Sequence, residues 1–410
     1  MTAGEIIMGK DKITKSGDAR KVTKDLSVKY KPYFQIKAVY FTDNSPYAYV
    51  NMMRYEMDAP SITKGNNILI TADSLIKIYS PEMTGTISSK SVELSYRGKK
   101  ASLHAGSAQA SAGDAVIPLE AASEVINGHF YLDVENVMEK IFGKTAVWQC
   151  SYLAEGDFLG IGDSKEDGKD LLIYLDKKKG ILRRAYYYEE ANLIMPYLLY
   201  VPFSYTPKKK YKMVMILHGA GAGVGESRDL NWRPTVLETE AEKRNLILLF
   251  AEGYSMGFYG GCDPNLQPEK CSEEEKIYLR YCQNEPICAL KQVMAEFNID
   301  EKNIFITGNS MGGGGTFWLS MQYPGIFKAL APCGALTTDD LSRFDLSPLT
   351  GKPLMLVVGS ENIGFDNVEN QTAYLNAHGV PAKWHGVPGG VHGDAWTYAI
   401  DTIFDFFVQS

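Results

Sequence analysis

The chain has 410 residues, 45% of them hydrophobic and 22% charged, with a net charge of −7. This length predicts two or three domains with ample chain for a hydrophobic core. The negative charge argues against a nucleic acid partner, because phosphate binding needs a concentrated basic face. No apolar run reaches the roughly 18–20 residues that a bilayer span requires.

The N-terminal part of the chain is expected to hold a flexible lead-in and a small accessory domain. Residues 1–30 are polar and lysine-rich, and they lack the apolar stretch of a secretory signal. Residues 31–150 show short alternating segments, among them Leu75–Tyr79, which predict a β-rich α+β domain. A polar, turn-rich linker is expected over 151–183. Its Asp163, Asp167 and Asp170 lack the spacing of a calcium loop.

The end of this first domain carries a resemblance to a known module. Gly128–Val134 and Ile141–Trp148 resemble the copper amine oxidase N-terminal-like domain, which recurs on exported and cell-wall proteins of Gram-positive bacteria. The resemblance implies a secreted or cell-surface protein with access to the cell wall. It does not imply copper, since His104 and His129 are isolated, and we expect an accessory domain without chemistry of its own.

Six cysteines are present, and four of them, Cys262, Cys271, Cys282 and Cys288, fall within 27 residues. They could be thiols, zinc ligands or two disulfides. The gaps exceed the spacing of paired zinc ligands, so no metal site is expected. Two disulfides fit best in an exported protein, although the sequence does not give their pairing.

The second domain is expected over 184–410 as an α/β fold with a mostly parallel sheet. Apolar runs such as Tyr211–Leu217 and Leu246–Ala251 suit strands buried on both faces. They alternate with helical segments such as 233–244 and 310–323. This alternation predicts parallel strands covered by helices on both sides.

The candidate nucleophile is Ser310. It lies in Gly308-Asn309-Ser310-Met311-Gly312, which follows a short apolar strand and fits the G-x-S-x-G elbow. Glycines let strand and helix pass closely enough to expose a serine held in a strained turn. The helix start behind it offers backbone N–H groups to a developing oxyanion.

A second loop is expected to complete the oxyanion site. Leu217–Gly223 follows a buried strand, and such a loop supplies one donor while the residue after the nucleophile supplies the other. The predicted donors are Ala220 or Gly219, together with Met311. His218 is expected to brace this loop beside the bound substrate.

The candidate base is His392, on a glycine-flanked loop before the last helix; His385 is a weaker competitor because it lies within an apparent strand. The acid is expected after the strand at 354–359, where Glu361 and Asp366 are the candidates. Asn362 occupies the position where related layouts place Asp. An Asn stabilises an imidazolium less well than a carboxylate does.

Together these segments resemble an α/β-hydrolase esterase of the group that includes polyhydroxybutyrate-depolymerase-like, esterase-D-like and feruloyl esterase domains. The motifs are Tyr200–Pro202, Leu217–Gly221, Gly308–Gly313 and Gly390–His392. The resemblance implies hydrolysis of acyl esters, such as aryl, hydroxycinnamoyl or polysaccharide-linked esters, through a serine acyl-enzyme without metal or organic cofactor. Two alternatives are a prolyl-oligopeptidase-type peptidase and a catalytically inactive surface-binding protein.

The segment from Glu252 to Cys282 interrupts the regular alternation. Inserts at this edge of the sheet commonly cover the active site. We therefore expect Tyr254 and Tyr259 to line the acyl or leaving-group pocket. The alternative is a disulfide-stapled surface loop without substrate contact.

Overall fold

The computed structural model describes residues 36–151, 156–167, 178–223, 234–263, 266, 268–335 and 341–410. The predicted lead-in at 1–30 lies outside these residues. The chain divides into two compact units, and the first holds Gln35–Lys177 with Arg183–Pro196. The second holds Lys178–Leu182 with Tyr197–Ser410.

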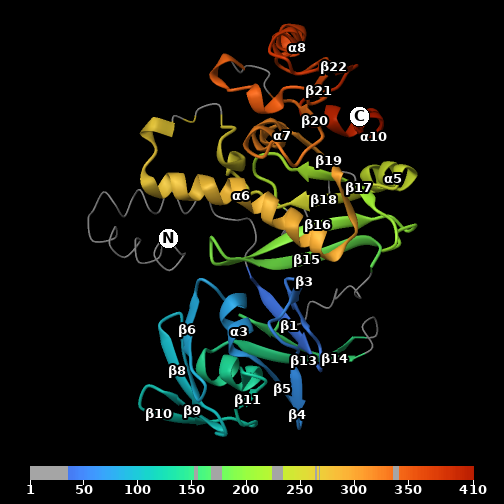
Figure 1. The fold of residues 1–410 in the computed structure, drawn as a ribbon. Coiled ribbons are helices and arrows are strands. Elements are labelled where there is room, and N and C mark those ends of the chain that lie inside the picture. Colours follow the sequence, from blue (N-terminus) through green and yellow to red (C-terminus); the bar gives the residue numbers. More distant parts are fainter. Residues whose placement is uncertain are drawn as a thin grey trace. The chain divides into compact units, whose positions relative to one another are not determined.

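Unit 1 is built mainly from antiparallel strands (Figure 1). One sheet has the order β13 (Thr145–Ser151), β14 (Gly156–Gly162), β1 (Ala38–Thr42), β2 (Tyr47–Val50), β3 (Met53–Glu56) and β15 (Gly180–Tyr188), with β3 and β15 parallel. A second has the order β10 (Ala115–Pro118), β9 (Gln109–Ala112), β8 (Lys99–His104), β7 (Ser91–Tyr96) and β6 (Met83–Ile87). A third has the order β11 (Glu124–Ile126), β12 (His129–Asp133), β5 (Asn67–Thr71) and β4 (Ile62–Lys64).

Two segments of unit 1 differ from the sequence-based expectation. Leu75–Tyr79, predicted as a strand, belongs to helix α3 (Ala72–Ile78), which Thr71 caps by accepting from the Ser74 N–H. Leu75 and Ile78 are buried at helical spacing, so this segment follows the 3.6-residue period. Residues 156–162, predicted as linker, form β14 between β13 and β1, because Phe158, Leu159 and Ile161 are buried there.

Unit 2 contains a run of parallel strands. Its order is β16 (Leu193–Val201), β18 (Ile247–Ala251), β17 (Tyr211–Leu217), β19 (Ile299–Asn309), β20 (Ala329–Cys333), β21 (Leu354–Gly359) and β22 (Ala382–Val387). Every neighbouring pair from β18 to β22 is parallel, and β16 is antiparallel to β18. Parallel pairing thus characterises this run, while the strands of unit 1 are mostly antiparallel.

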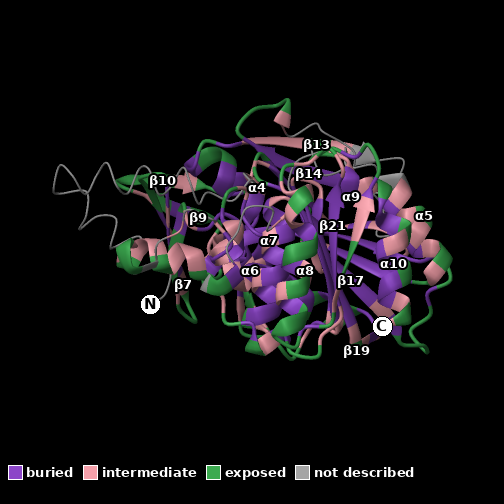
Figure 2. Ribbon diagram, turned by 90° about the horizontal axis from the view of Figure 1, so that it is seen from above, coloured by how far each residue is buried: buried purple, intermediate pink, exposed green. Residues whose placement is uncertain are grey.

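Helices cover both faces of this run (Figure 2). One face carries α5 (Pro234–Arg244), α9 (Ala395–Tyr398) and α10 (Ile400–Gln409), and the other carries α6 (Glu273–Glu296), α7 (Met311–Gln322) and α8 (Val368–Ala377). Beneath α5 and α10 lies a large hydrophobic cluster, in which the rings of Phe305 and Phe407 stack with centroids 4.9 Å apart. Such double coverage explains the unbroken apolar sequence of β17 and β18.

The predicted disulfides are wrong for the part of the chain that the structure describes. Cys262, Cys271, Cys282, Cys288 and Cys333 are all thiols. Cys282 packs against Gly257, and Cys262 packs against Gly314, so close packing rather than cross-linking orders this segment. None of the described helices is long and apolar enough to cross a membrane.

Candidate active site

Ser310 stands at a sharp turn between β19 and α7. Its backbone has φ 58° and ψ −119°, a conformation that costs energy for a residue with a side chain. A Cβ at Gly308 would lie 2.5 Å from the Leu217 carbonyl oxygen, and one at Gly312 would overlap the same carbonyl. The glycines of the elbow are therefore required because β17 and α7 approach this turn so closely.

His392 reaches the serine from the loop before α9. Its Nε2 lies 2.8 Å from Oγ of Ser310, which is hydrogen-bond distance. A neutral imidazole with its proton on Nδ1 accepts the serine proton in this arrangement. His392 is exposed, so a substrate can approach the pair. His385 lies in β22, paired in register with Val357, and the serine bond is made by His392 instead.

The loop after β17 is held in place by His218. This side chain is 5% exposed, and its Nδ1 lies 2.9 Å from the Gly219 carbonyl oxygen while its Nε2 contacts the Glu252 carbonyl. Burial lowers the pKa of His218, although both carbonyls oppose that effect, which favours the neutral ring. Both ring nitrogens thus lie against main-chain carbonyls, an arrangement that braces the loop.

The predicted oxyanion donors lie next to the elbow. Met311 is the first residue of α7, where backbone N–H groups have no acceptor within the helix. Ala220 is exposed and Gly219 is buried, so of the two loop candidates Ala220 offers the accessible backbone. A Cβ at Gly312 would lie 2.8 Å from the His218 carbonyl oxygen, which shows that loop and helix start are packed together.

Tyr254 and Tyr259, predicted to line the acyl or leaving-group pocket, are both buried, and their contact with a substrate stays a prediction. Their side chains are 1% and 0% exposed. The Tyr259 hydroxyl donates to the His218 carbonyl at 3.0 Å, and its ring packs against Gly315. Tyr259 thus holds the main chain of the predicted oxyanion loop at His218.

The two acid candidates lie on the loop after β21. The Glu361 N–H donates to the Gly390 carbonyl at 3.0 Å, and the Gly389 N–H donates to Ser360 Oγ at 2.8 Å. The loop after β21 and the loop that carries His392 are therefore joined by two hydrogen bonds. Glu361 and Asp366 are both exposed. Among the described residues, no carboxylate makes a hydrogen bond or ion pair with His392.

Sequence reasoning missed the role of Asn309, which the motif treats as a variable position. Its Nδ2 donates to the main-chain carbonyl of His392 at 3.0 Å. Only the position of Asn309 directly before the nucleophile hinted at a role. No cluster of His, Cys, Asp and Glu among the described residues could hold a metal ion.

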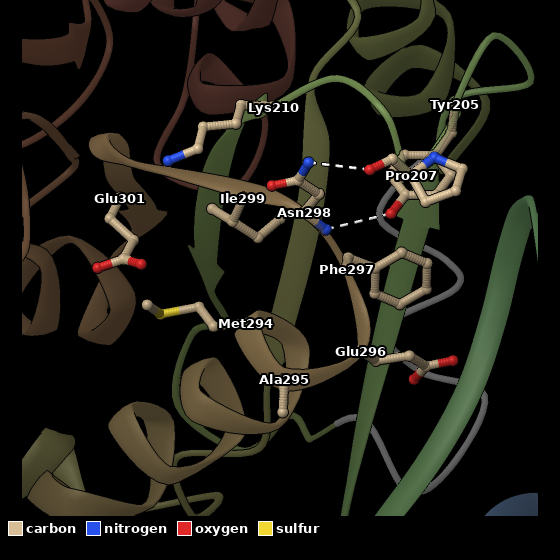
Figure 3. Close-up of a pocket in the computed structure, with 10 residues that line it drawn as sticks. All are labelled: Tyr205, Pro207, Lys210, Met294, Ala295, Glu296, Phe297, Asn298, Ile299 and Glu301. Atoms are coloured by element: carbon tan, nitrogen blue, oxygen red, sulfur yellow. Dashed lines mark hydrogen bonds between the residues drawn. The ribbon is translucent and has the colours of Figure 1, made fainter.

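A pocket of about 330 Å³ lies elsewhere in unit 2 (Figure 3). Its lining includes Tyr205, Lys210, Asn298 and Glu301, near the first residue of β19. Ile299 pairs with Tyr211 at one end of β17 and Gly308 pairs with Leu217 at the other, so about 20 Å separate the pocket from the turn at Ser310. The pocket therefore does not belong to the catalytic site.

Residues 190–404 match the model of the Esterase family, described as "Putative esterase". The match spans more than half of the chain. This chain belongs to the Esterase family. The esterase is accordingly an enzyme, a serine hydrolase that cleaves carboxylic esters, and the inactive alternative is set aside.

Solved structures similar to this esterase include three hydrolases. The substrate-bound fluorophosphonate-binding serine hydrolase F of Staphylococcus aureus has 18% identity and a TM-score of 0.43, over 56% of this chain and 99% of that one. A ferulic acid esterase has 16% identity and a TM-score of 0.45, over 56% and 97%. A thermostable esterase has 16% identity and a TM-score of 0.43, over 91% and 99%. Similarity at this level says nothing about substrate. A comparison with curated protein sequences found no match.

Proposed function

We propose that this esterase hydrolyses acyl esters through an acyl-enzyme on Ser310. The supporting observation is the 2.8 Å separation between Ser310 Oγ and His392 Nε2 at the strained elbow. Ser310 Oγ attacks the ester carbonyl carbon while His392 takes its proton. His392 then returns this proton to the leaving alcohol as the C–O bond breaks. Water attacks the acyl-enzyme by the same route in reverse.

The developing oxyanion is held by the backbone N–H groups of Met311 and Ala220. Loss of one such donor typically costs about 2.7–4 kcal/mol of transition-state stabilisation. Glu361 is our first candidate for the group that stabilises the His392 imidazolium, and Asp366 is the second. Glu361 is preferred because its own backbone is bonded to the histidine loop at Gly390.

The proposed substrates are aryl or hydroxycinnamoyl esters, including those attached to polysaccharides. The exposed catalytic histidine favours a substrate whose bulk stays outside the protein. Apolar side chains stand nearby in the sequence: Val391 next to His392 is 47% exposed, and Ile363 next to Asn362 is 78% exposed. Exposed apolar groups beside a reactive site suit an aromatic acyl group. Export and contact with the cell wall are proposals that rest on the resemblance of the N-terminal domain alone.

The test is Ser310→Ala, assayed with p-nitrophenyl acetate and a panel of aryl, acetyl-xylan and hydroxycinnamoyl esters. We expect kcat to fall at least about 10⁴-fold, because removing a nucleophile removes the covalent route. Labelling by a fluorophosphonate probe should disappear as well. Ser320→Ala is the matched control, since Ser320 lies on the same helix and donates only to the Thr316 carbonyl. Retained activity of Ser310→Ala with normal circular dichroism would refute the proposal, and cleavage of peptide amides at comparable kcat/KM would favour a peptidase.

A further inference from the structure

The nucleophile strand is attached to the histidine segment at two points. Thr307 and Asn309 lie two residues apart on β19, so their side chains share one face. Asn309 Nδ2 donates to the His392 carbonyl at 3.0 Å, and the Trp396 indole N–H donates to Thr307 Oγ1 at 3.1 Å. Both ends of the segment from His392 to Trp396 are therefore bonded to the strand that delivers Ser310.

These attachments lie in the interior. Asn309 is 6% exposed, Thr307 is 0% exposed and Trp396 is 1% exposed. A hydrogen bond in such a place is shielded from water, and removing one partner leaves the other buried without a partner, which is unfavourable. Thr307 Oγ1 donates onward to the Ala331 carbonyl at 2.7 Å, which fixes its orientation.

The Asn309 amide also lies beside the imidazole. A Cβ placed on Gly334 would lie 2.9 Å from Asn309 Oδ1 and 3.3 Å from His392 Nδ1. Amide oxygen and ring nitrogen thus both face the same small glycine. Asn309 Oδ1 is buried and accepts no hydrogen bond from the described residues, so the stability gained from this amide comes through its Nδ2 alone.

From these contacts we infer that Asn309 is a positioning residue for the catalytic histidine, an inference that rests on the proposed function. The His392 ring has no carboxylate contact among the described residues, and its loop carries glycines at 389, 390 and 393. The bond from Asn309 fixes the backbone of His392 and so keeps Nε2 within reach of Ser310 Oγ. Misplacement of a catalytic group by about 1 Å can cost about 100-fold in rate.

The first test compares Asn309→Leu with Asn303→Leu. Leucine resembles asparagine in size but cannot donate to the His392 carbonyl. We expect kcat to fall about 10–100-fold for Asn309→Leu, with KM within about twofold, since the oxyanion loop is untouched. Fluorophosphonate labelling should slow to the same extent. Asn303 lies on the same strand six residues before Asn309, where it bonds Asp300 and Lys328, and Asn303→Leu should leave kcat unchanged.

The second test is Asn309→Asp, which separates positioning from mere stability. An ionised carboxylate at this position would be repelled by the His392 carbonyl oxygen, because both groups are negative. A protonated one could donate a hydrogen bond to this oxygen, as the Asn309 amide does. The ratio of variant to wild-type kcat should therefore rise as the pH is lowered, while the ratio for Asn309→Leu should stay flat.

Three results would overturn this inference: an unchanged kcat in Asn309→Leu, an equal loss in Asn303→Leu, or a pH-independent ratio for Asn309→Asp. If Asn309→Leu does not fold, the Asp variant decides. Activity retained by Ser310→Ala would refute the proposed function instead, so the two failures are distinguishable.

Discussion

At the scale of single residues, the site combines a serine in a strained backbone conformation, Ser310, with a histidine whose side-chain orientation depends on its neighbours, His392. Ser310 is fixed by its backbone, while His392 must be oriented by its neighbours. A carboxylate normally holds the imidazole and stabilises its charged form. Here the acid loop is joined to the histidine loop through the Glu361 N–H, but neither Glu361 nor Asp366 makes a contact with the ring. Which of the two carboxylates acts on His392 is therefore a question for mutagenesis.

We predict that Glu361→Gln lowers kcat about 10²–10⁴-fold, because an amide keeps the shape but cannot stabilise the imidazolium. Asp366→Asn should stay within about twofold of the wild type. Glu369→Gln is the matched control, since Glu369 is exposed on α8. Kinetics with p-nitrophenyl acetate at pH 7–8 measures all three. A larger loss of kcat in Asp366→Asn than in Glu361→Gln would identify Asp366 as the acid. An unchanged kcat in both variants would contradict a catalytic carboxylate on this loop.

The sequence predicts a site residue best where the backbone geometry permits only one type of residue. The elbow could be predicted because only glycine fits beside the Leu217 carbonyl, and this requirement is written in the motif. Asn309 could not be predicted, since a bond to a carbonyl 83 residues away leaves no local pattern. The burial of Tyr254 and Tyr259 could not be predicted, because an aromatic residue in the sequence is compatible with a pocket lining and with a packed interior.

At the scale of elements, α7 is unusual for carrying four consecutive glycines, residues 312–315, directly after its first residue Met311. Each glycine reduces helix propensity by about 1 kcal/mol relative to alanine. The helix tolerates them because each permits a close approach: Gly312 to Leu217, Gly313 to the Cys333 carbonyl, Gly314 to Cys262 and Gly315 to Tyr259. Tertiary packing thus replaces intrinsic helix stability at the point where the helix must present its N-terminus to the substrate.

Gly315→Ala should therefore destabilise the protein despite the higher helix propensity of alanine. The added Cβ would overlap the Tyr259 ring, and overpacking of this kind costs about 1–3 kcal/mol. Because Tyr259 also holds the His218 carbonyl, kcat should fall as well. Urea denaturation followed by tryptophan fluorescence measures the free energy of unfolding. Gly325→Ala is the control, since nothing lies within 4 Å of its Cβ. Equal stability of the two variants would contradict this account of the helix.

The strands of unit 2 were foreseeable from their apolar runs, whereas α3 and β14 were not. The short apolar segment Leu75–Tyr79 fits the two-residue period of a strand as well as the 3.6-residue period of a helix. The cap at Thr71 favours the helix. Strand β14 has only three buried apolar residues, and the charged residues that follow it make the whole segment resemble a polar linker.

At the scale of the whole molecule, stability does not depend on cross-links among the described cysteines. Cys262, Cys282 and Cys333 are buried, and burial raises the pKa of the Cys333 thiol well above its usual range. The thiolate is the reactive form, so these residues are protected by packing. Their clustering in sequence reflects the packing of the segment from Glu252 to α6 against α7.

We predict that a reducing agent leaves the melting temperature unchanged within about 1 °C. Loss of a structural disulfide typically costs about 2–5 kcal/mol and would lower it clearly. Titration with an aromatic disulfide reagent should label Cys271 and Cys288 first, because they are partly exposed. At least five thiols should react in denaturant without prior reduction. Fewer than five under those conditions would contradict the thiol state.

The division of the chain between the two units has a practical consequence for making smaller versions of this enzyme. Along the chain, Lys178–Leu182 belongs to unit 2, the following segment Arg183–Pro196 belongs to unit 1, and the chain from Tyr197 belongs to unit 2 again. Within unit 1, Arg184 and Ala185 pair with Arg54 and Tyr55 of β3. A truncated esterase beginning at residue 184 would keep β15 residues Arg184 and Ala185 but would lack β3, the strand with which they pair. The exposed strand edge would invite pairing with other chains. The units are thus interwoven along the sequence, and a single cut does not separate them cleanly.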